Sequence, residues 1–191
     1  MQIKIQLKRG FDNTTVEAYL VNLGQRHVDD YVNSWVEKLR LFSQEDKYWD
    51  WIFKLRYIAN QKNLEGYAVE CENKTQGLMI IETQMHGSRL NLGNKLVYVD
   101  GIATAPTNRI EIQYPPQFKG VGQALLNFAR IRSVELGYAG RVGLHSLPSA
   151  EGFYEKQNMV NCGAEEEYDN LVYFEYGVMR KKITSESSKN L

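Results

Sequence analysis

Hydrophobic and polar residues alternate at the start of the chain and then change to a helical spacing. Within residues 3–8 the Ile and Leu side chains fall on one face and the Lys and Gln side chains on the other, the pattern of a half-buried strand. Over residues 28–42 apolar residues recur every three or four positions, which predicts a helix whose charged ends match the helix dipole. A second amphipathic helix is expected from about Asp46.

The remaining pattern predicts six more strands and two more helices. The predicted strands cover residues 67–72, 77–83, 96–104, 141–146, 159–164 and 171–179, and the predicted helices run from Gly120 to Gly137 and from Ser149, as N-cap, to Asn158. The first two of these strands flank a polar turn at 73–76 and are interpreted as a hairpin.

The fold class that follows is mixed α/β (α+β). We expect one domain over residues 1–180, with about seven mostly antiparallel strands, about four helices and the element order β-α-α-β-β-β-α-β-α-β-β. The polar segment 181–191 is expected to be a flexible C-terminal tail.

Composition limits the partners. The 191 residues carry 23 basic and 23 acidic side chains, so no net charge draws the chain to nucleic acid or to a membrane surface. The two cysteines, Cys71 and Cys162, are interpreted as reduced thiols, and no apolar run reaches membrane-spanning length. We therefore expect a cytoplasmic protein without a nucleic-acid or membrane partner, and a homodimer is compatible with this composition.

The segment 117–126 is a glycine-containing loop that leads directly into an apolar-periodic helix. The first amides of a helix have no partner within it, and the helix dipole is positive there, so a phosphate group is the natural ligand. The P-loop pattern G-x-x-x-x-G-K-[ST] is absent from the chain. A dinucleotide fingerprint G-x-G-x-x-G would begin at Gly120, but Leu125 stands at its third glycine position.

The loop instead resembles the acetyl-coenzyme A (acetyl-CoA) loop of the GCN5-related N-acetyltransferase (GNAT) superfamily, whose pattern [QR]-x-x-G-x-[GA] is matched by Gln117, Gly120 and Gly122. A second stretch, residues 150–159, is similar to that family's A-x-x-[FL]-Y-x-K-x-G-F. It departs from the pattern only at its end, where Asn158 precedes a Met, and Asn also tolerates the left-handed conformation that ends a helix.

The resemblance covers residues 65–180 well and the first 60 residues only by element order. It implies a GNAT fold and an acetyl-CoA-dependent N-acetyltransferase, in which an amine attacks the thioester directly in a ternary complex. The alternative is a non-catalytic module that binds CoA or acetyl-CoA for regulation. A third hypothesis, a toxin that acetylates aminoacyl-tRNA, is disfavoured by the neutral charge.

The resemblance also implies where acetyl-CoA binds. A bulge near Gly101 would bring the backbone close to the thioester. The pyrophosphate would lie on the loop amides and the pantetheine arm along the preceding strand, so the implied contacts are Gln117, Phe118, Lys119, Gly120, Val121, Gly122 and Gln123 in the loop, and Ile102, Ala103 and Thr104 in the strand.

Tyr154 matches the family's tyrosine that protonates the departing sulfur, so it is the candidate general acid. An alkylamine with a pKa near ~10.4 is neutral only about once in 10³ at pH 7, so a proton acceptor is needed as well. The candidate is Asp100, which alternation places on the face of Tyr98 and Ile102. For each of these residues a purely structural role stays open.

Other titratable groups carry weaker signals. Glu82 and His145 are secondary candidates for the base, and His27 and His86 are expected to be exposed. No group of His, Cys and Asp has the spacing of a metal site, so no metal is expected.

The acceptor is the least specified part of the prediction. Family acceptors contact the regions that correspond to residues 42–49 and 165–170, and both contain aromatic side chains. The acidic cluster in 165–170 would favour a cationic amine, either a small molecule or a peptide. An insertion at 105–116 with strand-like alternation at 110–112 is interpreted either as an ordered excursion near the acceptor or as a surface loop.

Overall fold

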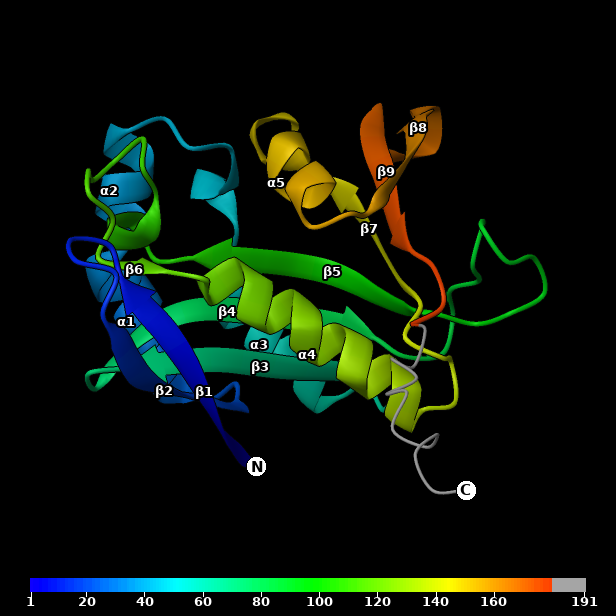
Figure 1. The fold of residues 1–191 in the computed structure, drawn as a ribbon, viewed down its shortest axis with the longest axis horizontal. Helices are drawn as coiled ribbons and strands as arrows, with labels where there is room; N and C mark the ends of the chain where they lie inside the picture. The colour runs from blue at the N-terminus through cyan, green and yellow to red at the C-terminus, as the bar shows by residue number, and fades with distance from the viewer. Residues whose placement is uncertain (180–191) are drawn as a thin grey trace, which may run out of the picture.

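A nine-stranded sheet forms the centre of the molecule, in the order β6-β1-β2-β3-β4-β5-β7-β9-β8 (Figure 1). The computed structural model describes residues 1–179, and the predicted tail 181–191 lies outside the described residues. All neighbouring strands are antiparallel except the parallel pair β5–β7. The strands are β1 (Gln2–Arg9), β2 (Thr15–Asn22), β3 (Leu64–Cys71), β4 (Lys74–Glu82), β5 (Val97–Thr104), β6 (Phe118–Lys119), β7 (Val142–Ser146), β8 (Val160–Glu165) and β9 (Leu171–Tyr176).

Helices cover both faces of this sheet. α4 (Val121–Glu135) lies across one face, whereas α1 (Gln25–Ser34), α2 (Val36–Leu41) and α3 (Trp51–Ala59) belong to the other (Figure 1). The short α5 (Glu151–Lys156) follows β7. Between α2 and α3 runs a single 3₁₀ turn, η1 (Glu45–Tyr48).

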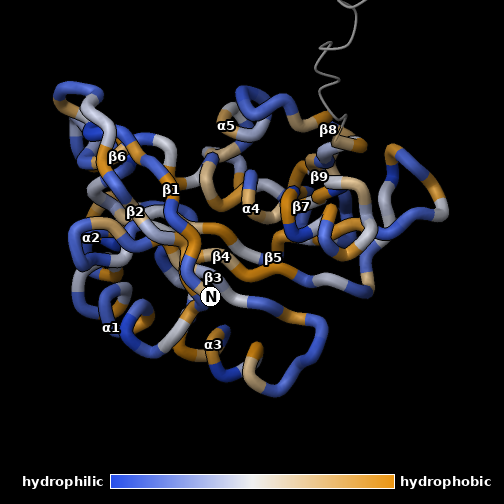
Figure 2. Tube along the Cα trace, turned by 60° about the horizontal axis from the view of Figure 1, so that its bottom comes forward, coloured by the Kyte–Doolittle hydropathy of each residue, from blue (hydrophilic) through white to orange (hydrophobic). Residues whose placement is uncertain are grey.

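The two faces have separate hydrophobic clusters that share the central strands. On β4, Met79 and Ile81 pack in the cluster of α4, whereas Leu78 and Ile80 pack in the cluster of α1 and α3. Figure 2 shows the corresponding concentration of apolar residues along β4 and β5, with polar residues along the outer loops. Because β4 is buried on both faces, its sequence is a run of mostly apolar residues rather than an alternation of apolar and polar ones.

The predicted fold class is confirmed, but the predicted element order lacked two strands. β2 was not predicted, although its side chains alternate and Ala18 and Leu20 are buried. β6 was also not predicted, because a strand of two residues leaves no periodic signal. The sheet therefore has nine strands rather than about seven.

Three local predictions were wrong. The helix expected over 28–42 is divided at Trp35, which ends α1 and precedes α2. The turn between β3 and β4 consists of Glu72 and Asn73, both with positive φ, rather than of residues 73–76. Ser149 does not cap α5: it lies in a 3₁₀ turn, and its hydroxyl donates 2.6 Å to Glu45 of η1.

Candidate functional site

The glycine loop forms an open helix N-terminus. Gly120 is the N-cap of α4 and has φ 94°, a left-handed conformation that favours glycine. The first intrahelical bond runs from the amide of Ala124 to the carbonyl of Gly120. The amides from Gly120 to Gln123 donate no hydrogen bond within residues 1–179. Four N–H groups without a partner in the described residues therefore lie together at the positive end of the helix dipole.

The segment before this N-terminus is fixed by three contacts. Phe118 is 1% exposed and belongs to the core, and its amide donates 2.9 Å to Oδ1 of Asn108. Lys119 pairs with Lys8 of β1, and its Nζ donates 2.8 Å to Oδ1 of Asn13. The Phe118 amide is thus already used. The free donors of the loop begin after β6, rather than at Phe118 as the sequence suggested.

Gly122 contacts the element that carries the second motif. A Cβ built on Gly122 would lie 3.0 Å from Cζ of Phe153 in α5. The absence of a side chain at Gly122 therefore serves two purposes: it leaves the helix N-terminus accessible, and it lets the Phe153 ring pack on α4. The two motifs, 117–122 and 150–159, meet in space.

β5 and β7 pair only at their starts. Val97 pairs with Val142 and Tyr98 with Gly143, and no further pair forms although β5 continues to Thr104. Figure 1 shows the two strands separating toward the N-terminus of α4. The backbone of β5 from about Val99 onward thus lacks a partner strand on the β7 side, where a ligand could pair with it.

The bulge expected near Gly101 is present. Ile80 pairs with Gly101 and Ile81 with Val99, so Asp100 is the extra residue on β5. A Cβ on Gly101 would lie 3.5 Å from the Trp49 ring, so a side chain here would approach that ring.

The bulge also separates Ile102 from Asp100, although alternation predicted that the two lie on one face. Ile102 packs in the α4 cluster, whereas Asp100 reaches the other face, where its Oδ2 accepts 2.9 Å from Nζ of Lys54 in α3. Asp100 and Ile102 are therefore on opposite faces, because the extra residue breaks the alternation. Lys54 also lies over the Trp49 ring, 5.6 Å from its centroid.

Tyr154 lies in the α4 cluster and is 5% exposed. Its ring centroid is 5.2 Å from that of Phe153 and 5.6 Å from that of Phe174. Burial raises the pKa of the phenol, and the hydroxyl is protonated at neutral pH even at the ordinary pKa of tyrosine. Within residues 1–179 this hydroxyl has no hydrogen-bond partner, so its proton is available to a ligand atom.

Of the two secondary base candidates, Glu82 has a structural task. Its carboxylate accepts 2.8 Å bonds from the side chain of Asn63 and from the amides of Gln84 and Met85. His145 is placed differently: its Nδ1 lies 2.8 Å from the hydroxyl of Tyr98 and its Nε2 lies 3.0 Å from Oε2 of Glu165. Tyr98 and Lys54 were not predicted as site residues, since each is an ordinary member of a strand or helix pattern.

The two histidines that were expected to be exposed are not. His27 is 6% exposed; its Nδ1 accepts 2.9 Å from the amide of Gly24, and its Nε2 lies 2.8 Å from Oε1 of Glu70. His86 is half-buried and stacks on Tyr98 with ring centroids 4.0 Å apart.

The insertion 105–116 forms turns rather than a strand at 110–112, where Ile110 is 62% exposed. Its base is anchored by Arg109, whose guanidinium donates 2.7 and 2.6 Å to the two carboxylate oxygens of the buried Asp46. The same group donates to the carbonyl of Thr104. The insertion is therefore ordered at its base and joins the end of β5 to η1.

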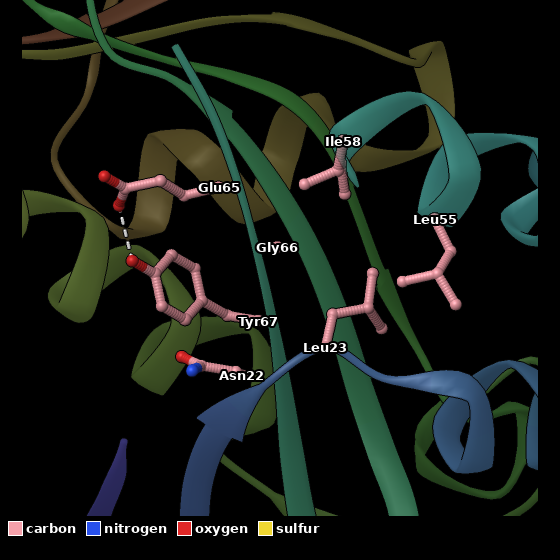
Figure 3. Close-up of a pocket in the computed structure, with 7 residues that line it drawn as sticks. All are labelled: Asn22, Leu23, Leu55, Ile58, Glu65, Gly66 and Tyr67. Atoms are coloured by element: carbon pink, nitrogen blue, oxygen red, sulfur yellow. Dashed lines mark hydrogen bonds between the residues drawn. The ribbon is translucent and has the colours of Figure 1, made fainter. Parts of the chain in front are cut away.

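A pocket of about 280 Å³ lies between β2, β3 and α3 (Figure 3). It shares no residue with the predicted site and is lined by Asn22, Leu23, Leu55, Ile58, Glu65, Gly66 and Tyr67. Within residues 1–179 no three His, Cys, Asp or Glu side chains gather as metal ligands. The helices of the same residues are too short or too polar to cross a membrane.

No protein-family model and no curated protein sequence matches this chain. Solved structures do. An acetyltransferase from Salmonella typhimurium that modifies the N-terminal serine of ribosomal protein L7/L12 is 12% identical, with a TM-score of 0.60 over 85% of this chain and 95% of its own. The ribosomal-protein-S18-alanine N-acetyltransferase of Escherichia coli is 14% identical, with a TM-score of 0.55 over 87% and 97%.

An aminoglycoside 6′-N-acetyltransferase complexed with coenzyme A is 11% identical, with a TM-score of 0.58 over 85% of this chain and 98% of its own. At these identities the likeness concerns the fold. The nine-stranded sheet with its diverging parallel pair, and the open N-terminus of α4, agree with that likeness. The chain therefore has the fold of the GCN5-related N-acetyltransferases.

Proposed function

We propose that the chain is an acetyl-CoA-dependent N-acetyltransferase, which transfers the acetyl group to an amine by direct attack in a ternary complex. The main support is that two features occur together: the amides at the start of α4 have no partner in the described residues, and β5 is unpaired with β7 beyond Tyr98. A phosphate group fits the first, and an extended amide-containing arm fits the second. Acetyl-CoA contains both.

The donor contacts follow from this arrangement. The amides of Gly120, Val121, Gly122 and Gln123 would hold the pyrophosphate, and Lys119 would add a positive charge from the adjacent strand end. The backbone of Ile102, Ala103 and Thr104 would pair with the pantetheine arm. Gln117 and Phe118 support the loop through their own hydrogen bonds to Thr107 and Asn108.

Tyr154 is the proposed general acid. Its hydroxyl is protonated at neutral pH and has no hydrogen-bond partner within residues 1–179, and the residue belongs to α5, which lies beside the diverging strands (Figure 1). Asp100 is proposed to hold a water beside the attacking amine, since it is the exposed carboxylate at the bulge. A proton taken up by Asp100 itself would break its ion pair with Lys54.

The acceptor is proposed to be a primary amine of a small molecule or a peptide. The solved structures of the same fold include enzymes for aminoglycosides and for the N-terminal residues of ribosomal proteins. A panel for this chain would therefore contain an aminoglycoside with a 6′-amine, peptides that begin with alanine or serine, and spermidine.

Calorimetry with acetyl-CoA, followed by thiol release on this panel, tests the proposal. Gly122→Leu should weaken acetyl-CoA binding at least ~100-fold, because each charge-assisted amide bond contributes about 1.5–3 kcal/mol. Gly152→Ala is the matched control, since a Cβ at Gly152 meets nothing within 4 Å.

Undiminished binding by Gly122→Leu, with an unchanged melting temperature, would reject the loop as the donor site. If the wild type binds acetyl-CoA but releases thiol with no amine of the panel, the chain is instead the non-catalytic CoA-binding module.

A further inference from the structure

Three side chains near the bulge, those of Tyr98, His145 and Glu165, are joined in a continuous hydrogen-bonded relay. The hydroxyl of Tyr98 on β5 lies 2.8 Å from Nδ1 of His145 on β7, and Nε2 of that ring lies 3.0 Å from a carboxylate oxygen of Glu165 at the end of β8. The relay thus crosses three strands, joining β5, where the donor arm is proposed to lie, to the β8–β9 hairpin.

Tyr98, the residue of this relay on β5, is next to the proposed reaction centre. Tyr98 is the last β5 residue that pairs with β7, and it precedes the bulge residue Asp100 by two positions. Burial raises the pKa of the Tyr98 phenol, and the negative charge of Asp100 acts in the same direction. On β5, Tyr98 carries the side-chain hydroxyl that lies closest in sequence to the bulge.

The rings of the relay are fixed on both sides. His86 stacks on Tyr98 with centroids 4.0 Å apart, and Tyr168 stacks on His145 at 3.7 Å. Glu165 is paired with Arg89 as well as with His145. A ring held by stacking and by hydrogen bonds at both ends keeps the alignment that proton transfer requires.

The protonation state of His145 is determined by its surroundings. Burial lowers its pKa to about 4, and the charge of Arg89 and then that of His86 act in the same direction. The neutral ring satisfies both neighbours only when Nε2–H donates to Glu165 and Nδ1 accepts from the Tyr98 hydroxyl. The titratable groups in contact with the ring are Tyr98 of β5, Glu165 and Tyr168 of the β8–β9 hairpin, and Tyr173 of β9, and the loop 83–96 adds His86 and Arg89. One group further out, Asp100 acts on Tyr98 and His86, and Glu175 accepts from Tyr173.

We propose that Tyr98 is a catalytic residue that receives the proton of the acceptor amine, and that His145 and Glu165 are positioning residues that carry this proton away. The inference rests on the proposed function. It assigns the amine proton a destination other than Asp100, whose carboxylate is paired with Lys54.

The amine nitrogen bonds to the thioester carbonyl carbon, and its proton passes to Oη of Tyr98 while the Tyr98 hydroxyl proton passes to Nδ1 of His145. The carbon–sulfur bond breaks with its electron pair on sulfur, and the sulfur takes the hydroxyl proton of Tyr154. The imidazolium of His145 donates through Nε2 to Glu165 and, because its surroundings lower its pKa to about 4, passes its proton on to water, while the Tyr154 phenolate takes one up.

The test measures kcat and KM on the best amine of the panel, together with the acetyl-CoA Kd. Tyr98→Phe keeps both stacked rings and should lower kcat about 10²-fold, with the acetyl-CoA Kd unchanged within twofold. His145→Asn keeps an acceptor for the Tyr98 hydroxyl but cannot take up the proton, so it should cause a similar loss. The double variant should be no slower than the slower single one, because both changes interrupt one path.

Tyr173→Phe is the matched control. It removes a buried hydroxyl that donates 3.1 Å to Glu175 and takes no part in the hydrogen bonds between Tyr98, His145 and Glu165. It should leave kcat within threefold of the wild type. If Tyr98→Phe also stays within threefold while the wild type turns over, the relay is overturned and the proposed function stands. If Asp100→Asn alone removes activity, Asp100 is the base.

A wild type that binds acetyl-CoA but acetylates no amine of the panel would remove the proposed function and, with it, this inference. Should Tyr98→Phe fail to fold, the kcat values of Glu165→Gln and His145→Asn test the same relay. Losses in kcat that multiply in the double variant would also overturn a shared path.

Discussion

Replacing Arg109 with methionine should lower the free energy of unfolding by about 3–5 kcal/mol, the range observed when one partner of a buried ion pair is removed. The size follows from the burial of the pair. Asp46 is 5% exposed and accepts 2.7 and 2.6 Å bonds from the two terminal nitrogens of Arg109. Without the guanidinium, a carboxylate stays buried with no opposite charge, and the Thr104 carbonyl loses two donors.

Urea denaturation followed by circular dichroism measures this loss. For a chain of this length about 1 kcal/mol corresponds to roughly 2–4 °C, so the melting temperature should fall by about 6–20 °C. Asp46→Leu combined with Arg109→Met removes both charges and should recover most of the loss, as apolar replacement of buried pairs does.

Lys54→Met serves as the comparison, because it breaks the more exposed pair with Asp100 and should cost at most about 1 kcal/mol. A loss below about 1 kcal/mol for Arg109→Met, or a double variant whose loss equals the sum of the single ones, would refute the reasoning. The insertion would then be attached to η1 by packing rather than by this ion pair.

Three further outcomes can be measured. Burial raises the pKa of Tyr31 in α1 to about 12. The contribution of the protonated phenol to the free energy of unfolding is therefore complete below pH 10 and is lost as the pH rises to 12. Between pH 9 and 12 the free energy of unfolding of Tyr31→Phe should fall by about 2–3 kcal/mol less than that of the wild type. Gly120→Ala should cost about 1–2 kcal/mol in urea denaturation through its φ of 94° alone, since the nearest side-chain atom is 3.9 Å from the added Cβ; a neutral result would contradict the left-handed cap. Tyr154→Phe should lower kcat roughly 10²-fold and leave the acetyl-CoA Kd unchanged, and equal turnover across pH would exclude Tyr154 as the acid.

The conformation of the loop before α4 was predictable because its signals are local. Gly120 and Gly122 lie one residue apart at a helix start, and a positive φ at Gly120 is what such a glycine commonly provides. The left-handed conformation expected at Asn158 is also present, with φ 61°. Each of these features depends on a few neighbouring residues, so the sequence pattern was sufficient.

The acceptor side was not predictable, because it is assembled over long separations. Asp100 meets Lys54 across 46 positions, and Arg109 meets Asp46 across 63. The bulge at Asp100 put Ile102 on the face opposite to the one that alternation predicted, and a bulge cannot be located by periodicity alone. His145 was recognised as a candidate, but its partners Tyr98 and Glu165 become visible only when three strands are aligned.

The pairing of β6 with β1 has a consequence for how the protein folds and responds to its donor. Phe118 and Lys119 lie against Arg9 and Lys8, so the loop that precedes α4 is completed only when the first strand has docked, across more than a hundred positions of chain. Acetyl-CoA at a hundred times its Kd would add about 2.7 kcal/mol to the stability of the native state. Part of that protection should appear as slower amide exchange in β1, far from the ligand in sequence. Under the proposed function, acetyl-CoA binding would therefore report whether the N-terminal strand has joined the sheet, and the effect of an affinity tag fused to that strand should be measured in this way first.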